Sequence, residues 1–172
     1  MAFVTHNRAM PTLLIVHHTL PGGTLQMAQA AAEGGAAEAG VQVRMLRAQE
    51  AGVQDVLAAA GYLFATPENL ASMAGVMKDF FDRTYYGALE RIEGRPYASM
   101  VCAGSDGEGA ARQIARIAMG WRLKPVAEPL IVCTHAQTPE AIAAPKRIAE
   151  ADRERCRALG EALATGLALG IF

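Results

Sequence analysis

The chain has 172 residues, of which 52% are hydrophobic and 19% charged, and its formal net charge is -1. This length fits one domain with a full hydrophobic core. The near-neutral charge excludes a basic nucleic-acid surface, and it argues against a carrier that docks through a strongly acidic face. No apolar run reaches the ~20 residues that a membrane-spanning helix needs.

The start of the chain and its cysteines indicate the cellular compartment of the protein. Residues 1–10 show no periodicity and no signal segment, so we expect a disordered lead before a domain over 11–172. Three widely spaced cysteines without a CxxC motif predict free thiols in a reducing cytoplasm and no zinc site. Cys102 and Cys133 lie in apolar runs and are expected in the core.

Apolar runs alternate with helical stretches from the start of the domain. Residues 13–16 form a continuous apolar run, typical of a strand buried on both faces. After a Pro/Gly segment, small apolar residues at helical spacing predict a helix over 24–39, with Thr24 as its N-cap and Gly40 after its last turn. Alternating residues at 41–46 predict a second strand.

The middle of the chain repeats this order. A short helix over 48–59 precedes a third strand at 61–65, and residues 66–74 are expected to form a loop. An amphipathic helix follows at 75–86, with apolar and charged side chains on opposite faces.

The last third continues the alternation. A fourth strand is expected at 96–103, a Gly-rich loop at 104–109, and then a helix whose apolar face ends in Trp121. A fifth strand at 129–133 and a helix over 145–168 complete the chain.

Strands that alternate with helices predict a parallel sheet with right-handed crossovers. Five such units suit a single α/β domain, a doubly wound sheet in the order 2-1-3-4-5. Ligands of these sheets bind beyond the carboxyl ends of the strands, where the order reverses. Three loops are expected to meet there, at 17–24, 66–73 and 104–109.

The first of these loops, H-H-T-L-P-G-G-T, joins a strand to a helix. Its glycines allow backbone N–H groups to face an anion, and the helix N-terminus adds partial positive charge. It holds no lysine and matches neither a Walker A loop nor GxGxxG, which favours a monophosphate over a triphosphate or a dinucleotide. A plain turn between strand and helix is the alternative.

The second loop offers Asn69 and backbone amides to a polar ring edge, with Leu70 and Met73 as packing groups. The alternative is a simple connection in which Ser72 caps the next helix and Met73 lies in the core.

The segment T-P-E-N-L-A-S-M-A-G-V-M-K-D-F-F-D-R-T-Y-Y at 66–86 resembles the flavodoxin-like and NAD(P)H-dependent FMN reductase families. These have a T-P-x-x-x-x-x-M-[SA]-G loop before a K-[DN]-[FW]-[FIL]-D-R helix. The first loop resembles their H-S-x-T-G-x-T phosphate loop, with His18 in place of Ser, Pro21 in place of Thr and one extra residue. The loop G-S-D-G-E-G resembles their Gly-rich loop after the fourth strand.

The resemblance implies bound FMN and NAD(P)H as electron donor. The phosphate would lie on the first loop, the isoalloxazine against the second, and the third loop would close the other side. The residues so implied are His18, Thr19, Gly22, Gly23, Thr24, Pro67, Glu68, Asn69, Leu70, Met73, Gly104, Ser105, Asp106 and Gly107. Relatives of this kind are often dimers or tetramers, so a homodimer or homotetramer is expected.

The leading hypothesis is a flavin oxidoreductase that passes a hydride from NAD(P)H through FMN to a small acceptor such as a quinone or free flavin. No side chain is singled out as catalytic. Glu68 and Asp106, in the loops beside the ring, are expected to lower its potential. A flavodoxin-type electron carrier and a scaffold that has lost FMN are the alternatives.

Overall fold

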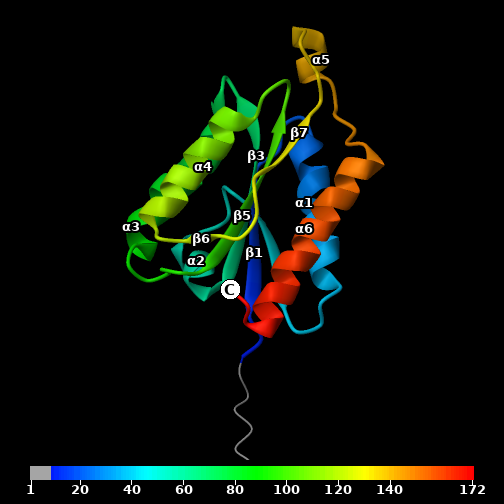
Figure 1. Ribbon diagram of the computed structural model, residues 1–172. Helices are drawn as coiled ribbons and strands as arrows, with labels where there is room; N and C mark the ends of the chain where they lie inside the picture. Colours follow the sequence, from blue (N-terminus) through cyan, green and yellow to red (C-terminus); the bar gives the residue numbers. More distant parts are fainter. Residues whose placement is uncertain (1–8) are drawn as a thin grey trace, which may run out of the picture.

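The computed structural model describes residues 9–172, so most of the expected lead at 1–10 lies outside the described residues. The chain folds into a single α/β domain around one mainly parallel sheet (Figure 1). The strands are β1 (Thr12–His17), β2 (Gln42–Arg47), β3 (Gly61–Asn69), β4 (Ser72–Met73), β5 (Pro96–Ala103), β6 (Lys124–Pro125) and β7 (Leu130–Cys133). The helices are α1 (Gly23–Ala36), α2 (Val53–Ala58), α3 (Gly75–Ala88), α4 (Glu108–Gly120), α5 (Pro139–Ala143) and α6 (Glu150–Leu169).

The order of the parallel strands confirms the predicted doubly wound sheet. It runs β2-β1-β3-β5, and both β6 and β7 pair with the free edge of β5. The fifth strand is therefore split into two pieces, with β7 as the predicted strand and β6 as an addition. No described helix is both long enough and apolar enough to cross a membrane.

Helices cover both faces of the sheet, as continuous apolar strands require. Helices α1 and α6 lie together on one side, and α2, α3 and α4 lie on the other (Figure 1). In β1, Leu14 and Val16 pack toward α2–α4, whereas Leu13 and Ile15 pack toward α1 and α6. Trp121 is fully buried beside Phe81, which confirms it as a core residue.

The two helices α1 and α6 approach each other through glycines. A Cβ atom on Gly34 would overlap the carbonyl oxygen of Arg157, and one on Gly160 would overlap that of Ala31. The backbones of the two helices therefore touch directly at these two positions. This contact fixes α6 against the helix that follows the first loop.

The expected loop at 66–74 was wrong over most of its length, because β3 continues to Asn69 and the chain turns back into β4 at Ser72–Met73. The two strands pair antiparallel, with Glu68 opposite Met73 and Asn69 opposite Ser72. The turn residues Leu70 and Ala71 have φ values of 51° and 61°, a conformation that hairpin turns usually give to Gly or Asn. The residue types at the turn therefore did not indicate this hairpin.

Helices α1, α2 and α6 also differ from the prediction in their boundaries. Gly22, with a φ of 111°, is the N-cap of α1, and Thr24 lies inside the first turn. That helix ends at Ala36, before Gly40, and α2 is only six residues long. Helix α6 begins at Glu150 instead of residue 145, because the preceding residues are held in an extended form against the first loop.

Candidate functional site

A cavity of about 380 Å³ opens where the carboxyl ends of β1, β3 and β5 meet. This is the edge at which the sheet order reverses, and its volume lies within the range of about 300–1,000 Å³ typical of ligand sites. The cavity is lined by Leu20, Pro21, Gly23, Thr24, Pro67, Glu68, Asn69, Leu70, Ala71, Cys102, Ala103, Gly104, Ser105, Thr134, Ala136, Ile142 and Lys146.

The first loop presents the start of α1 to this cavity. The first N–H groups of a helix have no partner within the helix. The Thr19 hydroxyl accepts the N–H of Leu25 at 3.1 Å, and the Gly22 carbonyl accepts that of Gln26 at 3.4 Å. In the described part of the chain, the amides of Gly23 and Thr24 have no such acceptor, so they are available to a ligand. A glycine suits this position, because a Cβ atom on Gly23 would lie 2.7 Å from the sulfur of Cys102 and the thiol would have to move.

Thr24 has an unpaired polar group at this end of the cavity. Its side chain is 1% exposed, and its hydroxyl has no hydrogen-bond partner. Within residues 9–172, His17 Nδ1 is the one other buried side-chain atom in this condition. A buried polar group without a partner costs about 1–3 kcal/mol. A ligand oxygen at the start of α1 would satisfy the Thr24 hydroxyl.

The β3–β4 hairpin forms the opposite wall of the cavity, and its tip is apolar. Pro67 is buried, whereas Leu70 at the tip is fully exposed. Leu20 of the first loop also lines the cavity and is 74% exposed. Large apolar side chains that stay exposed beside a cavity are available to pack on a ligand.

The carboxylate of Glu68 connects the hairpin to α4. One oxygen accepts the N–H of Gly107 at 2.8 Å, and the other accepts that of Ala110 at 3.1 Å. Glu68 therefore caps α4 from a distant part of the chain, where the partial positive charge of the helix favours a carboxylate. On α4, Gln113 accepts the N–H of Met73 at 2.8 Å and so holds the second strand of the hairpin.

We expect Glu68→Ala to lower the free energy of unfolding by about 1 kcal/mol, the typical cost of removing a helix cap. Urea unfolding followed by circular dichroism measures this loss. Glu161→Ala, at an exposed position on α6, serves as the control and should change stability by less than about 0.5 kcal/mol. Equal stability of the two variants would show that the cap contributes nothing.

The third loop contributes only its first half to the cavity. Gly104 and Ser105 line it, whereas Asp106 is exposed outside it. Gly107, with a φ of 91°, is the N-cap of α4.

The structure thus brings together eight of the sequence-predicted site residues. These are Gly23, Thr24, Pro67, Glu68, Asn69, Leu70, Gly104 and Ser105. The remaining six, His18, Thr19, Gly22, Met73, Asp106 and Gly107, do not line the cavity. Met73 is buried in the core, and the backbone N–H of His18 donates to Ala65 at 3.1 Å. Burial lowers the pKa of the His18 ring.

Several lining residues were not predicted from the sequence. Leu20, Pro21, Ala71, Cys102 and Ala103 lie within or beside the three loops. Thr134, Ala136, Ile142 and Lys146 come from residues 134–148, which connect β7 to α6 and which we call the strap. The carboxyl end of the fifth strand meets the same edge, so the parallel topology gave a signal for this fourth segment.

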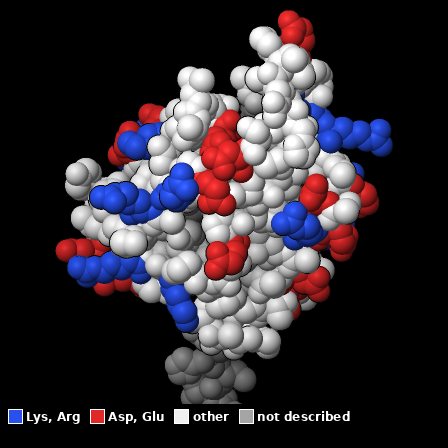
Figure 2. All heavy atoms as spheres, turned by 45° about the horizontal axis from the view of Figure 1, so that its top comes forward, with Lys and Arg blue, Asp and Glu red and all other residues white. Residues whose placement is uncertain are grey.

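The titratable groups of the site offer no nucleophile. Burial raises the pKa of the Cys102 thiol to about 11, although the nearby Lys146 charge opposes the shift. The thiol is therefore protonated at neutral pH. No cluster of three or more potential metal ligands occurs among the described residues. Acidic side chains gather near the middle of the face above the strand ends, with basic ones toward both sides (Figure 2).

Comparisons with known proteins agree with this geometry. The chain is 29% identical over 168 residues to a flavodoxin of Aquifex aeolicus, covering 93% of this chain and 89% of the relative. It is 33% identical over 95 residues to an NAD(P)H dehydrogenase (quinone) of Acidithiobacillus ferrooxidans, covering 44% of this chain and 48% of that one. A flavodoxin from the domain Archaea superposes with a TM-score of 0.73 at 17% identity, covering 91% and 98% of the two chains.

The family model for NADPH-dependent FMN reductases matches residues 47–138. That match covers more than half of the chain and includes the β3–β4 hairpin, the third loop and the start of the strap. The chain belongs to the NADPH-dependent FMN reductase family.

Proposed function

We propose that this protein binds FMN in the cavity and acts as an NAD(P)H-dependent oxidoreductase that reduces a small acceptor. The buried hydroxyl of Thr24 carries the proposal, because it lines the cavity without a partner beside the free amides at the start of α1. A phosphate group satisfies such donors, and helix N-termini commonly bind phosphate. Membership of an FMN reductase family supports the choice of FMN.

The residues present fit each part of this cofactor. Gly23 and Thr24 would hold the phosphate, while Pro67, Asn69 and Leu70 would contact the isoalloxazine. Gly104 and Ser105 would lie on the opposite side. The other predicted residues would hold the cavity walls in place. Thr19 and Gly22 hold the start of α1, and Glu68 accepts a hydrogen bond from Gly107 that joins the hairpin to α4. Met73 packs in the core. His18 and Asp106 lie outside the cavity lining.

When bound, FMN supplies the hydride chemistry. The chain binds and orients it and shapes the surroundings of its ring. Both oxygens of the Glu68 carboxylate accept hydrogen bonds from the start of α4, which would fix the position of its charge beside the cavity. Leu20 and Leu70 line the cavity with large apolar side chains and would exclude water from the bound cofactor.

The visible absorption spectrum of the purified protein tests this proposal. We expect the two flavin bands to survive desalting after incubation with FMN, and NADH or NADPH to bleach them in the absence of oxygen. Bands that survive but stay unbleached with either nucleotide would instead indicate a flavodoxin-type electron carrier. Failure to retain FMN under any condition would contradict both functions and leave a scaffold without the cofactor.

We also propose that the acceptor is a small molecule and that the chain works in the cytoplasm as a homodimer or homotetramer. The exposed side chains of Tyr86 and Met119, 82% and 73% accessible, offer apolar surface to a second copy. Three cysteines without a disulfide suit a reducing compartment.

A further inference from the structure

The first loop is a phosphate cradle without a cation of its own, yet the structure brings a lysine to it from the far end of the chain. Lys146, in the strap, lines the same cavity as Thr24 although the two are more than a hundred residues apart. Among the residues that line the cavity, all within the described chain, Lys146 carries the positive charge and Glu68 the negative one. Both oxygens of the Glu68 carboxylate accept hydrogen bonds from the start of α4, so this helix end holds the one acidic side chain of the lining.

The backbone of Lys146 is fixed against the first loop by several hydrogen bonds. Its N–H donates to the carbonyl of Pro21 at 3.4 Å. The Gln26 side chain donates to the carbonyl of Lys146 at 2.6 Å and accepts the N–H of Ile148 at 3.0 Å. A Cβ atom on Gly23 would lie 3.3 Å from Cβ of Lys146. The strap therefore passes directly over the first residue of α1.

To bind an anion, the ammonium group of Lys146 would exchange at least one of its present partners in the strap. It donates to the backbone carbonyls of Ala141, Ile142 and Ala144, at 3.0 Å and 2.9 Å for the last two. All three partners are neutral carbonyls, whereas a phosphate would add the attraction between opposite charges to the hydrogen bond. The flexible four-carbon stem lets an ammonium move without shifting its backbone. The opposing effect of Lys146 on the pKa of Cys102, a residue of the same cavity, reflects how near its charge lies.

We propose that Lys146 is the cation of the phosphate site, completing from the strap the cradle that Gly23 and Thr24 begin. The unpartnered, buried hydroxyl of Thr24 marks the position of the anion independently of the lysine. This assignment rests on the proposed function in one respect, that the anion is the phosphate of FMN. It assigns a role to a segment whose sequence carries no phosphate-loop pattern.

Binding of FMN and of riboflavin, which lacks the phosphate, separates this role from a structural one. Equilibrium dialysis of the full chain gives both dissociation constants. For Lys146→Gln we expect the constant for FMN to rise about tenfold, the factor for one hydrogen bond to a charged group, while that for riboflavin changes less than about twofold. Lys146→Arg should restore FMN binding. Added salt should weaken FMN binding by the natural chain more than by Lys146→Gln.

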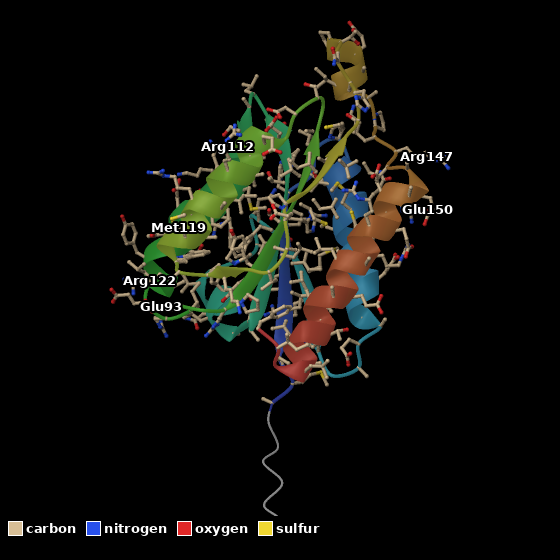
Figure 3. The ribbon with its side chains drawn as sticks, viewed as in Figure 1. Glu93, Arg112, Met119, Arg122, Arg147 and Glu150 are labelled. Atoms are coloured by element: carbon tan, nitrogen blue, oxygen red, sulfur yellow. The ribbon has the colours of Figure 1, made fainter. Side chains whose placement is uncertain are left out.

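Arg147→Gln provides the matched control. It removes the same charge from the next residue, which does not line the cavity and whose side chain points away from the sheet (Figure 3). It should bind FMN and riboflavin as the natural chain does. An equal loss of both flavins in Lys146→Gln would overturn the proposal in favour of a strap that only needs its carbonyl contacts. Unchanged FMN binding would overturn it as well.

Inorganic phosphate keeps the test independent of the cofactor. If the natural chain binds neither flavin, the proposed function fails, but the anion site is still measurable. Phosphate should then raise the unfolding temperature of the natural chain and of Arg147→Gln more than that of Lys146→Gln, since a ligand stabilises the state that binds it. Equal shifts in all three proteins would contradict an anion site at Lys146.

Discussion

We expect Thr24→Val to weaken FMN binding while making the flavin-free protein more stable. The dissociation constant for FMN should rise about tenfold or more, because a hydrogen bond to a charged group contributes about 1.5–3 kcal/mol. The free energy of unfolding without flavin should rise by about 1 kcal/mol, because the variant no longer buries a hydroxyl without a partner. Flavin titration and urea unfolding measure the two effects. Their opposite signs are typical of a residue kept for binding at a cost in stability.

Thr84→Val is the matched control for this experiment. Thr84 is also a buried helical threonine, but its hydroxyl donates to the carbonyl of Phe80 at 2.7 Å, away from the cavity. Its replacement should lower the free energy of unfolding by about 1 kcal/mol and leave flavin binding unchanged. If Thr24→Val behaved like Thr84→Val in both measurements, the Thr24 hydroxyl would have a partner within the protein and no role in binding.

Gly160→Ala is expected to lower the free energy of unfolding by about 3 kcal/mol, at the upper end of the usual cost of overpacking a core. The new methyl group would overlap the backbone of α1 at Ala31, and a backbone carbonyl cannot rotate away as a side chain can. Helices α1 and α6 would have to separate. Urea unfolding should show a lower midpoint with an unchanged slope. Gly34→Ala should act in the same direction, because its methyl group would overlap Arg157 in the same interface.

The double variant Gly34→Ala/Gly160→Ala and a control substitution at an uncrowded glycine complete this test. Once α1 and α6 have separated for one methyl group, the second costs less, so the loss in Gly34→Ala/Gly160→Ala should be smaller than the sum of the single losses. Gly75→Ala, at the exposed start of α3, meets no atom within 4 Å and should change stability by less than about 1 kcal/mol. A Gly160→Ala protein as stable as Gly75→Ala would contradict the close contact.

Much of the fold followed from local patterns. The strands at 13–16, 61–65 and 96–103 are apolar runs that only a sheet covered on both faces can bury, and the alternation with helices dictated parallel pairing. The position of the cavity followed as well, because ligands bind at the reversal of strand order in such sheets. The segment at 66–73 was identified as part of the site by its residue types, and it lies within the residues that the family model matches.

The β3–β4 hairpin depended on contacts between residues far apart in the sequence, which no local pattern contains. Leu70 and Ala71 occupy a turn that their residue types disfavour, and Glu68 and Gln113 hold it against α4 from positions about forty residues apart. Hydrogen bonds between residues so far apart in the sequence are decided by how the hairpin and α4 pack against each other.

The sequence by itself determined the fold class, the edge of the sheet that binds a ligand and eight of the residues that line it. Only the tertiary structure decided which polar groups are left without a partner there, and which distant segment covers them. Thr24 reads as a helix cap in the sequence, yet in the fold Gly22 is the cap and the Thr24 hydroxyl is buried without a partner. Lys146 lies within the helix predicted over 145–168, yet in the fold it belongs to the strap, and it reaches the first loop because Gln26 and Pro21 hold the strap there. The physical reason is that hydrogen-bond satisfaction and charge in a buried site depend on every segment packed around it, whereas hydrophobic periodicity is a property of each segment alone.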